Sequence, residues 1–207
     1  MDNTKTISIV ISSFHYGHLA GHCIDSVISQ NRKPDKIYFV DDGIGDCKHL
    51  KEIYPEVEYV LRETNLGTVD NFQDMLNRVD TDYVMFLGAD NWLRPDTLEV
   101  LEKNLNNVVM YDIQVVGEFA KEITKRHPNE VSKNEWGYYW KRKGGHHGSM
   151  LYNVARAKEV GGYNAGYGAR TLEDQSLFNR MRDFGVNHID QAFLYYRRHR
   201  ENFNAVK

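Results

Sequence analysis

Apolar runs alternate with amphipathic segments through the first hundred residues. The β-branched run at 7–11 is typical of a strand buried on both faces of a parallel sheet. Further runs predict strands at residues 36–41, 57–61 and 83–87. Apolar residues at helical spacing predict helices over residues 19–28, 69–79 and 95–101, with Pro95 in the first turn of the last helix. Alternating strands and helices form right-handed βαβ units, so this half predicts a doubly wound, mostly parallel sheet of the nucleotide-binding type.

The second half of the chain is less regular. The pattern predicts a long strand at residues 108–119, an aromatic-rich polar region at 125–147, helices at 154–160 and 172–184, and a strand at 192–196. The last strand leads into the basic group at 197–200. Internal repeats and low-complexity linkers are absent from the sequence. We therefore expect one α/β domain over residues 1–207, with two functional halves at about 1–107 and about 108–207.

Composition and charge exclude several classes of protein. The chain has 207 residues, 41% of them hydrophobic and 27% charged, and lacks an apolar stretch long enough to span a bilayer. Its first residues do not resemble a secretory signal, and its two cysteines are too few for a disulfide scaffold. A formal net charge of -3 argues against a dedicated nucleic-acid surface. We expect a cytoplasmic protein without a transmembrane segment, and its aromatic share of 12% needs an explanation.

Small, acidic and amide residues gather where the predicted strands end. They are Ser12, Ser13 and Phe14; Asp41, Asp42 and Gly43; Glu63, Asn65 and Gly67; and Gly88, Ala89, Asp90 and Asn91. Ligands of open parallel sheets bind outside the carboxyl ends of the strands, and a nucleotide would use such groups for its base, ribose and diphosphate. The alternative is that Asp, Asn and Gly only form the turns after the strands. Four such ends together favour a nucleotide site.

The sequence has neither of the common glycine-rich phosphate loops. It contains no G-x-G-x-x-G after the first strand and no G-x-x-x-x-G-K-[ST]. This weakens dinucleotide dehydrogenases and P-loop NTPases as classes. Neutralisation of a diphosphate must come from another group, and Asp90 with a hard cation such as Mn2+ or Mg2+ is the natural candidate.

At this point the motifs resemble those of a known family. ISIVISSF at 7–14, VDDG at 40–43, NLG at 65–67 with Asn71, and YVMFLGADN at 83–91 with Pro95-Asp96 resemble the nucleotide half of the family 2 glycosyltransferases of GT-A fold. GGY at 161–163, ED at 173–174 and YRRH at 196–199 resemble the second half of that family. The resemblance implies a Rossmann-like, mostly parallel central sheet with helices on both faces and a smaller acceptor-side subregion. Residues 1–107 would bind the nucleotide sugar, and residues 108–207 would bind the acceptor and carry the catalytic base.

Carried over by position, the resemblance implies roles for individual residues. The nucleotide-binding positions are Ser12, Ser13, Phe14, Asp41, Asp42, Asn65, Gly67, Asn71, Gly88 and Ala89. Asp90 matches the metal ligand at the end of the D-x-D motif, and His199 matches a further ligand of some members. Gly88 stands where the family usually has the first Asp, so the contacts of that acid would be weaker, made by backbone, or supplied by Asn91 or another group. A surface histidine in a basic cluster is the alternative for His199.

Asp174 is the expected catalytic base. Displacement of a nucleotide at an anomeric carbon requires an acceptor hydroxyl that loses its proton as it attacks from the opposite face, which predicts inversion. Glu173 and Asp174 also open a predicted helix, so stabilisation of the helix N-terminus is the competing interpretation.

Weaker candidates lie on the donor-sugar and acceptor side. Aromatic rings stack on the C–H faces of sugars, so Trp136 and Trp140 are a candidate platform, with core packing as the alternative. The glycine-rich stretch that ends in Gly148 and Ser149 is a candidate loop against the donor, and Glu173 and Arg197 complete the set. The basic run 141–143 offers peripheral contact with an anionic lipid or glycan, or is merely solvated.

These observations lead to one main hypothesis. We expect an inverting, metal-dependent glycosyltransferase that moves a sugar from a nucleotide donor, most simply a UDP-sugar, to a glycan, lipid-linked or protein-linked acceptor hydroxyl. Gly88 motivates an alternative, a nucleotide-sugar or glycan binding module that has lost turnover. A sugar-phosphate nucleotidyltransferase is disfavoured because the glycine-rich, Arg-containing loop after the first strand is absent.

Overall fold

The computed structural model describes residues 4–117, 132–134, 137–142, 147–163 and 173–202. Its helices are α1 (Gly17–Ile28), α2 (Leu50–Ile53), α3 (Thr68–Arg78), α4 (Thr97–Glu102), α6 (Val154–Glu159) and α7 (Glu173–Met181), with 3-10 turns η1 (His147–Ser149) and η2 (Arg182–Phe184). Its strands are β1 (Ile7–Ser13), β2 (Lys36–Asp41), β3 (Glu58–Leu61), β4 (Tyr83–Gly88), β5 (Trp92–Leu93), β6 (Val108–Val116), β7 (Ser132–Asn134), β8 (Gly137–Arg142), β9 (Met150–Asn153) and β10 (Val186–Arg197).

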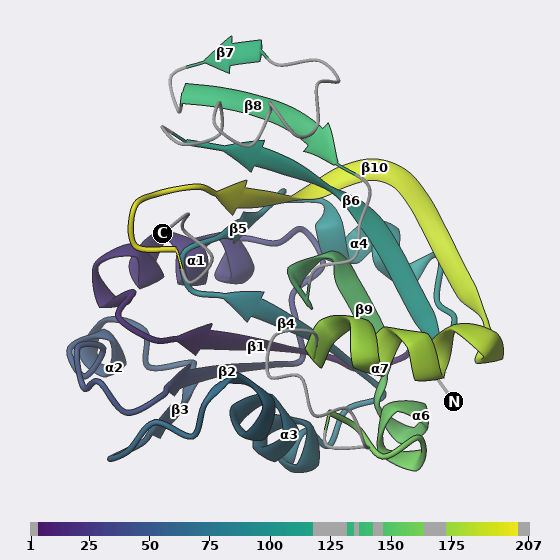
Figure 1. The fold of residues 1–207 in the computed structure, drawn as a ribbon, viewed down its shortest axis with the longest axis horizontal. Helices are drawn as coiled ribbons and strands as arrows, with labels where there is room; N and C mark the ends of the chain where they lie inside the picture. The colour runs from purple at the N-terminus through teal and green to yellow at the C-terminus, as the bar shows by residue number, and fades with distance from the viewer. Residues whose placement is uncertain (1–3, 118–131, 135–136, 143–146, 164–172, 203–207) are drawn as a thin grey trace.

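Strands β1 to β4 form the parallel part of one large sheet, in the order β3-β2-β1-β4 (Figure 1). Ile9 at the centre of β1 pairs with Ile37 of β2 and with Met85 of β4. The predicted strands and helices of this half are confirmed within one or two residues at most ends. Pro95 is an exception, because α4 begins two residues later, after Asp96. Strand β4 pairs with β1 on the side away from β2, and all three strands run parallel. Their carboxyl ends therefore lie together at one edge of the sheet.

The rest of the sheet mixes parallel and antiparallel pairs. It continues from β4 through β9, β6 and β10 to β5, and only β6 and β10 pair in parallel there. The hairpin of β7 and β8 extends the sheet beside β6 (Figure 1). The sequence pattern predicted β6 and the end of β10 but missed β5, β7, β8 and β9. Strands β5 and β7 have two and three residues, too few for a periodic pattern to distinguish them from a loop.

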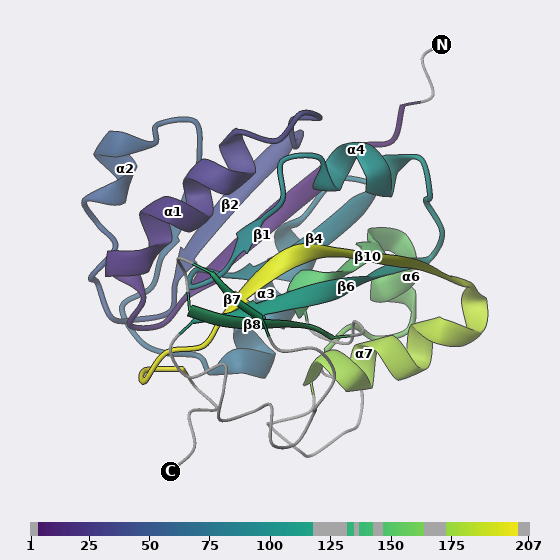
Figure 2. The same ribbon diagram turned by 90° about the horizontal axis from the view of Figure 1, so that it is seen from above.

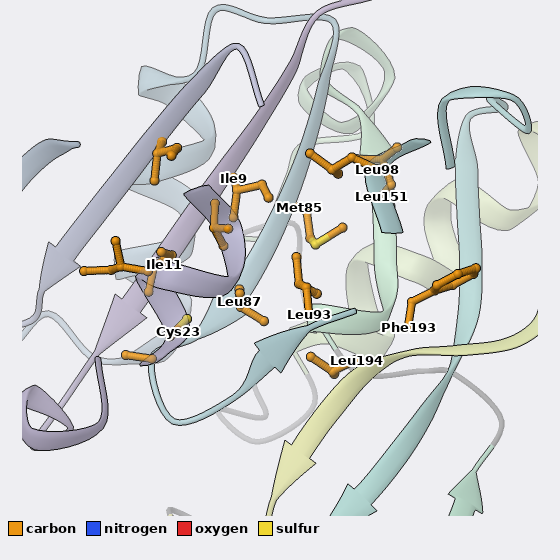
Figure 3. Packing of buried hydrophobic residues seen from close by; sticks show 14 of the residues in the cluster. Ile9, Ile11, Cys23, Met85, Leu87, Leu93, Leu98, Leu151, Phe193 and Leu194 are labelled. Carbon is orange, nitrogen blue, oxygen red and sulfur yellow. The ribbon is translucent and has the colours of Figure 1, made fainter. Parts of the chain in front are cut away.

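Two apolar cores lie on opposite faces of the sheet. One includes Ile9, Cys23, Met85 and Leu98, so helices α1 and α4 cover that face (Figure 3). The other includes Val10 and joins helices α3, α6 and α7 to the opposite face. Figure 2, viewed from above, shows α1 and α4 on one side of the strands and α3, α6 and α7 on the other. Burial on both faces explains the largely apolar pattern of the first strand, which Ser8 interrupts, and confirms the expected layer order.

The helices described are short. None of them, over the ranges given above, is long and apolar enough to cross a membrane.

Candidate functional site

A cavity of about 390 Å³ opens where β1, β2 and β4 end. Its wall is made by the strand ends, the start of α3 and the segment after β10, through Ser12, Phe14, His15, Tyr16, Asp42, Asn65, Gly67, Thr68, Asn71, Phe72, Gly88, Asp90, Asn91, Tyr196, Glu201 and Asn202. This is the edge at which open α/β sheets bind their ligands. Eight residues predicted for the nucleotide or the metal line this one cavity: Ser12, Phe14, Asp42, Asn65, Gly67, Asn71, Gly88 and Asp90.

Asn71 of α3 joins the end of β1 to a partly buried arginine. Its Nδ2 donates to Ser12 Oγ at 2.9 Å, while its Oδ1 accepts from the Arg62 guanidinium at 3.0 Å. Arg62 also lies 3.4 Å from Asp42 Oδ1 and donates to Asp74 at 2.8 Å. Arg62 was not predicted as a site residue, although a basic residue directly after β3 is visible in the sequence. Its position fixes which way the Asn71 amide faces.

The two adjacent acids after β2 have different surroundings. Asp42 lines the cavity with only 4% of its surface exposed, and its Oδ1 accepts the Leu66 N–H at 3.1 Å. Burial raises the pKa of Asp42, while the Leu66 N–H and the Arg62 charge act in the opposite direction. Asp41 is fully buried behind the wall, where its carboxylate accepts the backbone N–H groups of Ile44 and Gly45 at 3.0 and 2.9 Å. Only Asp42 of the pair therefore faces the cavity, and Asp41 holds the following turn.

Ser13 and Ala89 also lie behind the wall. Both are fully buried, and they contribute to the edge through the backbone. The Ser13 carbonyl accepts the Asp42 N–H at 3.0 Å, and the Ala89 N–H donates to the Ser12 carbonyl at 2.9 Å. Phe14, by contrast, is 40% exposed at the cavity, which leaves its ring open to a flat ligand group.

Asp90 and His199, the two predicted metal ligands, lie together. His199 Nε2 is 3.2 Å from Asp90 Oδ2, although the segment after β10 carries one and the end of β4 carries the other. Neighbouring ligands in an octahedral shell at 2.0–2.1 Å stand about 3 Å apart, so both atoms fit one divalent cation. Such a cation is commonly held by one or two protein groups together with water and substrate phosphates.

Arg197 supports Asp90 from the side away from the cavity. Its Nε donates to the Asp90 carbonyl at 3.0 Å, and its guanidinium lies over the Trp92 ring, 4.9 Å from the centroid. Its other end lies 3.1 Å from His22 Nδ1, and His22 stacks on Trp92. Burial lowers the pKa of His22, and the charge of Arg197 lowers it further. The arginine predicted to meet the donor sugar or acceptor is therefore engaged by these neighbours and is not among the residues that line the cavity.

A second group of potential metal ligands lies outside the cavity. Ligand atoms of Asp41, Asp46 and Cys47 lie within 4.8 Å of one another. Asp46 Oδ2, however, accepts the first N–H of α1 from Gly17 at 3.0 Å, and Asp41 holds its own turn. Burial raises the pKa of the Cys47 thiol to about 12, which disfavours the thiolate that a metal needs. These three side chains fit a structural role better than a metal.

The remaining predicted residues lie away from the cavity wall or outside the described residues. Gly148 and Ser149 are described and buried between β4 and β10, where a side chain at 148 would meet Leu87 and Leu194. Glu173 and Asp174 open α7 as predicted, but their side chains, like that of Trp140, lie outside the described part of the structure. Trp136 lies wholly outside it.

Comparison with known proteins gives matches in sequence. The sequence pattern described as "Glycosyl transferase family 2" matches residues 8–163. "Glycosyltransferase GlyA" of Streptococcus pneumoniae serotype 4 (strain ATCC BAA-334 / TIGR4) is 29% identical over 104 residues, which are 48% of this chain and 15% of GlyA. The chain therefore spans a small part of that relative.

Solved structures give matches in fold. S. aureus TarS 1-349 in complex with UDP has a TM-score of 0.65 at 16% identity, over 96% of this chain and 62% of TarS 1-349. TarS 1-349 in complex with UDP-GlcNAc has a TM-score of 0.68 at 14% identity, over 94% of this chain and 59% of the other. At these identities the likeness concerns the fold alone. It agrees with the α/β architecture described above.

Proposed function

The chain belongs to glycosyl transferase family 2, with the GT-A type of fold, and from this premise we propose that it transfers a sugar from a UDP-sugar to an acceptor hydroxyl. The acceptor belongs to a glycan, a lipid-linked saccharide or a protein. The UDP and UDP-GlcNAc complexes of TarS support uridine as the base and make UDP-N-acetylhexosamines the first donors to test.

One observation carries this proposal: a single cavity holds Asp42 and Asp90 on the two sides of β1. Strand β1 lies between β2 and β4, so the residues that follow those strands stand two strand spacings apart, roughly 10 Å. That separation suits a nucleoside diphosphate, with the base beside one acid and the diphosphate beside the other. Gly67 of the wall has only Asn65 Oδ1 within 4 Å of the position that a Cβ would take, which leaves space for a ligand there.

The base and ribose would bind on the Asp42 side. The carboxylate of Asp42 accepts an N–H of the base, and the exposed ring of Phe14 packs on it. Ser12 and Asn71 add polar contacts, with the orientation of the amide set by Arg62.

The diphosphate would bind on the Asp90 side. Asp90 and His199 would hold a divalent cation, Mn2+ or Mg2+, which supplies neutralisation of the charge on the leaving diphosphate. Arg197 keeps Asp90 at this edge by holding its carbonyl. This edge thus offers a carboxylate and an imidazole suited to a cation, and the sequence has no glycine-rich phosphate loop to replace them.

The second half of the chain would supply the acceptor side. Asp174 is the second residue of helix α7, which begins at Glu173. We assign Asp174 as the base that takes the proton of the acceptor hydroxyl, so attack opposite the diphosphate inverts the anomeric carbon. Trp136, Trp140 and Glu173 stay the candidates for contact with the sugars.

A donor screen tests the proposal. UDP, GDP and dTDP release is measured from matched nucleotide sugars, with mixed simple sugars as acceptors and with Mn2+, Mg2+ or EDTA. UDP release that needs both acceptor and cation is the expected result. Release of GDP or dTDP alone, or equal rates in EDTA, would contradict the assignment of base or cation.

The replacement of the usual acid by Gly88 favours a second candidate, a binding module without turnover. Isothermal titration with UDP and Mn2+, combined with a donor-hydrolysis assay, separates the two. Metal-dependent UDP binding without turnover across the donor and acceptor panel would favour the module.

A further inference from the structure

The carboxylate of Asp90 is held at both oxygens by side-chain amides. Asn91 Nδ2 donates to Oδ1 at 2.8 Å, and Asn202 Nδ2 donates to Oδ2 at 2.9 Å. All three side chains are almost fully buried, with 6%, 2% and 6% exposure for Asp90, Asn91 and Asn202. Hydrogen bonds from buried amides to a carboxylate are strong and directional, so they fix the plane in which its remaining lone pairs point.

Asn202 also sets the position of His199. Its Oδ1 accepts the His199 N–H at 2.7 Å, and its Nδ2 donates a further bond to the Arg197 carbonyl at 3.1 Å. The Asn202 amide thus closes the turn after β10 and also contacts the Asp90 carboxylate. The same turn brings the His199 imidazole to that carboxylate. A change at Asn202 alters the relative position of both candidate cation ligands.

Asn91 lies in the space that a side chain at position 88 would need. A Cβ built on Gly88 would stand 2.8 Å from Asn91 Nδ2 and 2.8 Å from Asp90 Oδ1, which are the two ends of the hydrogen bond described above. Real Cβ atoms do not approach other atoms so closely, so a side chain at 88 and the Asn91–Asp90 bond exclude each other in this arrangement. Asn91 Oδ1 meanwhile accepts the Arg197 N–H at 3.0 Å, which ties the end of β4 to the end of β10.

We propose that Asn91 and Asn202 form an amide clamp that orients Asp90 and His199 for a divalent cation, and that Gly88 is the residue that makes room for it. The inference rests on the proposed function, because the cation is that of the donor diphosphate. Asn91 and Asn202 are positioning residues: they contact the ligands and not the cation. Loss of such second-layer partners commonly reduces metal affinity about 10- to 100-fold.

The test measures Mn2+ binding to the UDP-loaded protein by electron paramagnetic resonance, beside UDP binding in EDTA and the thermal unfolding midpoint. Asn202→Ala should weaken Mn2+ binding by about tenfold or more, and leave UDP affinity in EDTA within about twofold. Asn107→Ala is the matched control, because Asn107 Nδ2 donates to the Phe184 carbonyl at 2.8 Å near the start of β6, away from the cavity. It should leave Mn2+ affinity unchanged.

A second variant keeps the test decisive if Asn202→Ala does not fold. Gly88→Ala adds one methyl group against the Asn91–Asp90 bond and should weaken Mn2+ binding by a larger factor than UDP binding in EDTA. Wild-type Mn2+ affinity in every variant that folds would overturn the clamp. An equal loss of UDP and Mn2+ binding would also overturn it, because that result indicates collapse of the cavity. A wild-type protein that binds neither UDP nor Mn2+ would overturn the clamp and the proposed function together.

Discussion

The His199 imidazole lies 3.2 Å from the Asp90 carboxylate, across 109 positions of sequence. A second pair of the same type exists in the described structure, His188 and Asp112 at 2.8 Å, on neighbouring strands β10 and β6. Only the first pair includes a cavity-lining residue. The pairing of histidine with aspartate is therefore not sufficient for a cation site, and the location at the strand ends makes the difference.

This contrast gives the first prediction. Asp90→Asn should abolish the Mn2+ stimulation of UDP binding, because the substitution removes the charge of a cation ligand, and should leave binding in EDTA within about twofold. Asp112→Asn, which removes an equally buried carboxylate beside a histidine, should retain the stimulation. Isothermal titration of UDP with and without Mn2+ measures both. Equal stimulation in wild type and Asp90→Asn would remove Asp90 as a ligand.

A second prediction concerns the pH dependence of UDP binding. Asp42 must be ionised to accept the base N–H, and burial raises its pKa above the ordinary 3.8. UDP affinity should therefore decline as the pH falls towards that raised pKa, at a higher pH than an exposed aspartate would give. Asp42→Asn should remove this dependence and weaken binding at neutral pH by about tenfold or more, as expected for loss of a hydrogen bond to a charged group. If Asp42→Asn lost UDP affinity at low pH in the same way as the wild type, another group would be responsible for the pH dependence.

The adjacent acid should behave differently. Asp41→Asn replaces a carboxylate oxygen that accepts a backbone N–H by an NH2 group, so we expect the free energy of unfolding to fall by about 1–3 kcal/mol. UDP affinity of the folded protein should change much less than in Asp42→Asn, because Asp41 is fully buried behind the cavity wall. Urea denaturation and UDP titration of both variants make the comparison. A purely binding defect in Asp41→Asn would place its carboxylate on the ligand.

Asp174 provides the test of the chemical step. Asp174→Asn should abolish sugar transfer while Mn2+-dependent UDP binding survives, because the base acts on the acceptor and not on the nucleotide. Asp183→Asn, at an acid with 85% side-chain exposure just beyond the end of α7, is the control and should keep full turnover. Chromatography of the glycosylated product measures sugar transfer, and titration with UDP and Mn2+ measures binding. Turnover by Asp174→Asn would require a different base.

Local pattern predicted the first half of the fold well for a clear physical reason. Strand β1 is buried on both faces and pairs on both edges, which agrees with the isoleucine- and valine-rich stretch at 7–11 from which it was predicted. Helix α3 likewise has one apolar stripe against the sheet, which the spacing of Phe72 and Leu76 made readable. Strand β5 has two residues and pairs with β10, about a hundred positions later. Nothing in its own sequence could indicate that partner.

For the cavity, the kinds of residue that follow each strand could be predicted locally, because acids, amides and glycines at strand ends are local features. Which of them face the cavity depends on how the strands and loops fold together. Asp41 and Asp42 are alike in sequence, but successive residues at a strand end point in different directions, so one holds a turn and the other lines the cavity. Asn202 carried no signal, since its role arises only when the segment after β10 folds against Asp90.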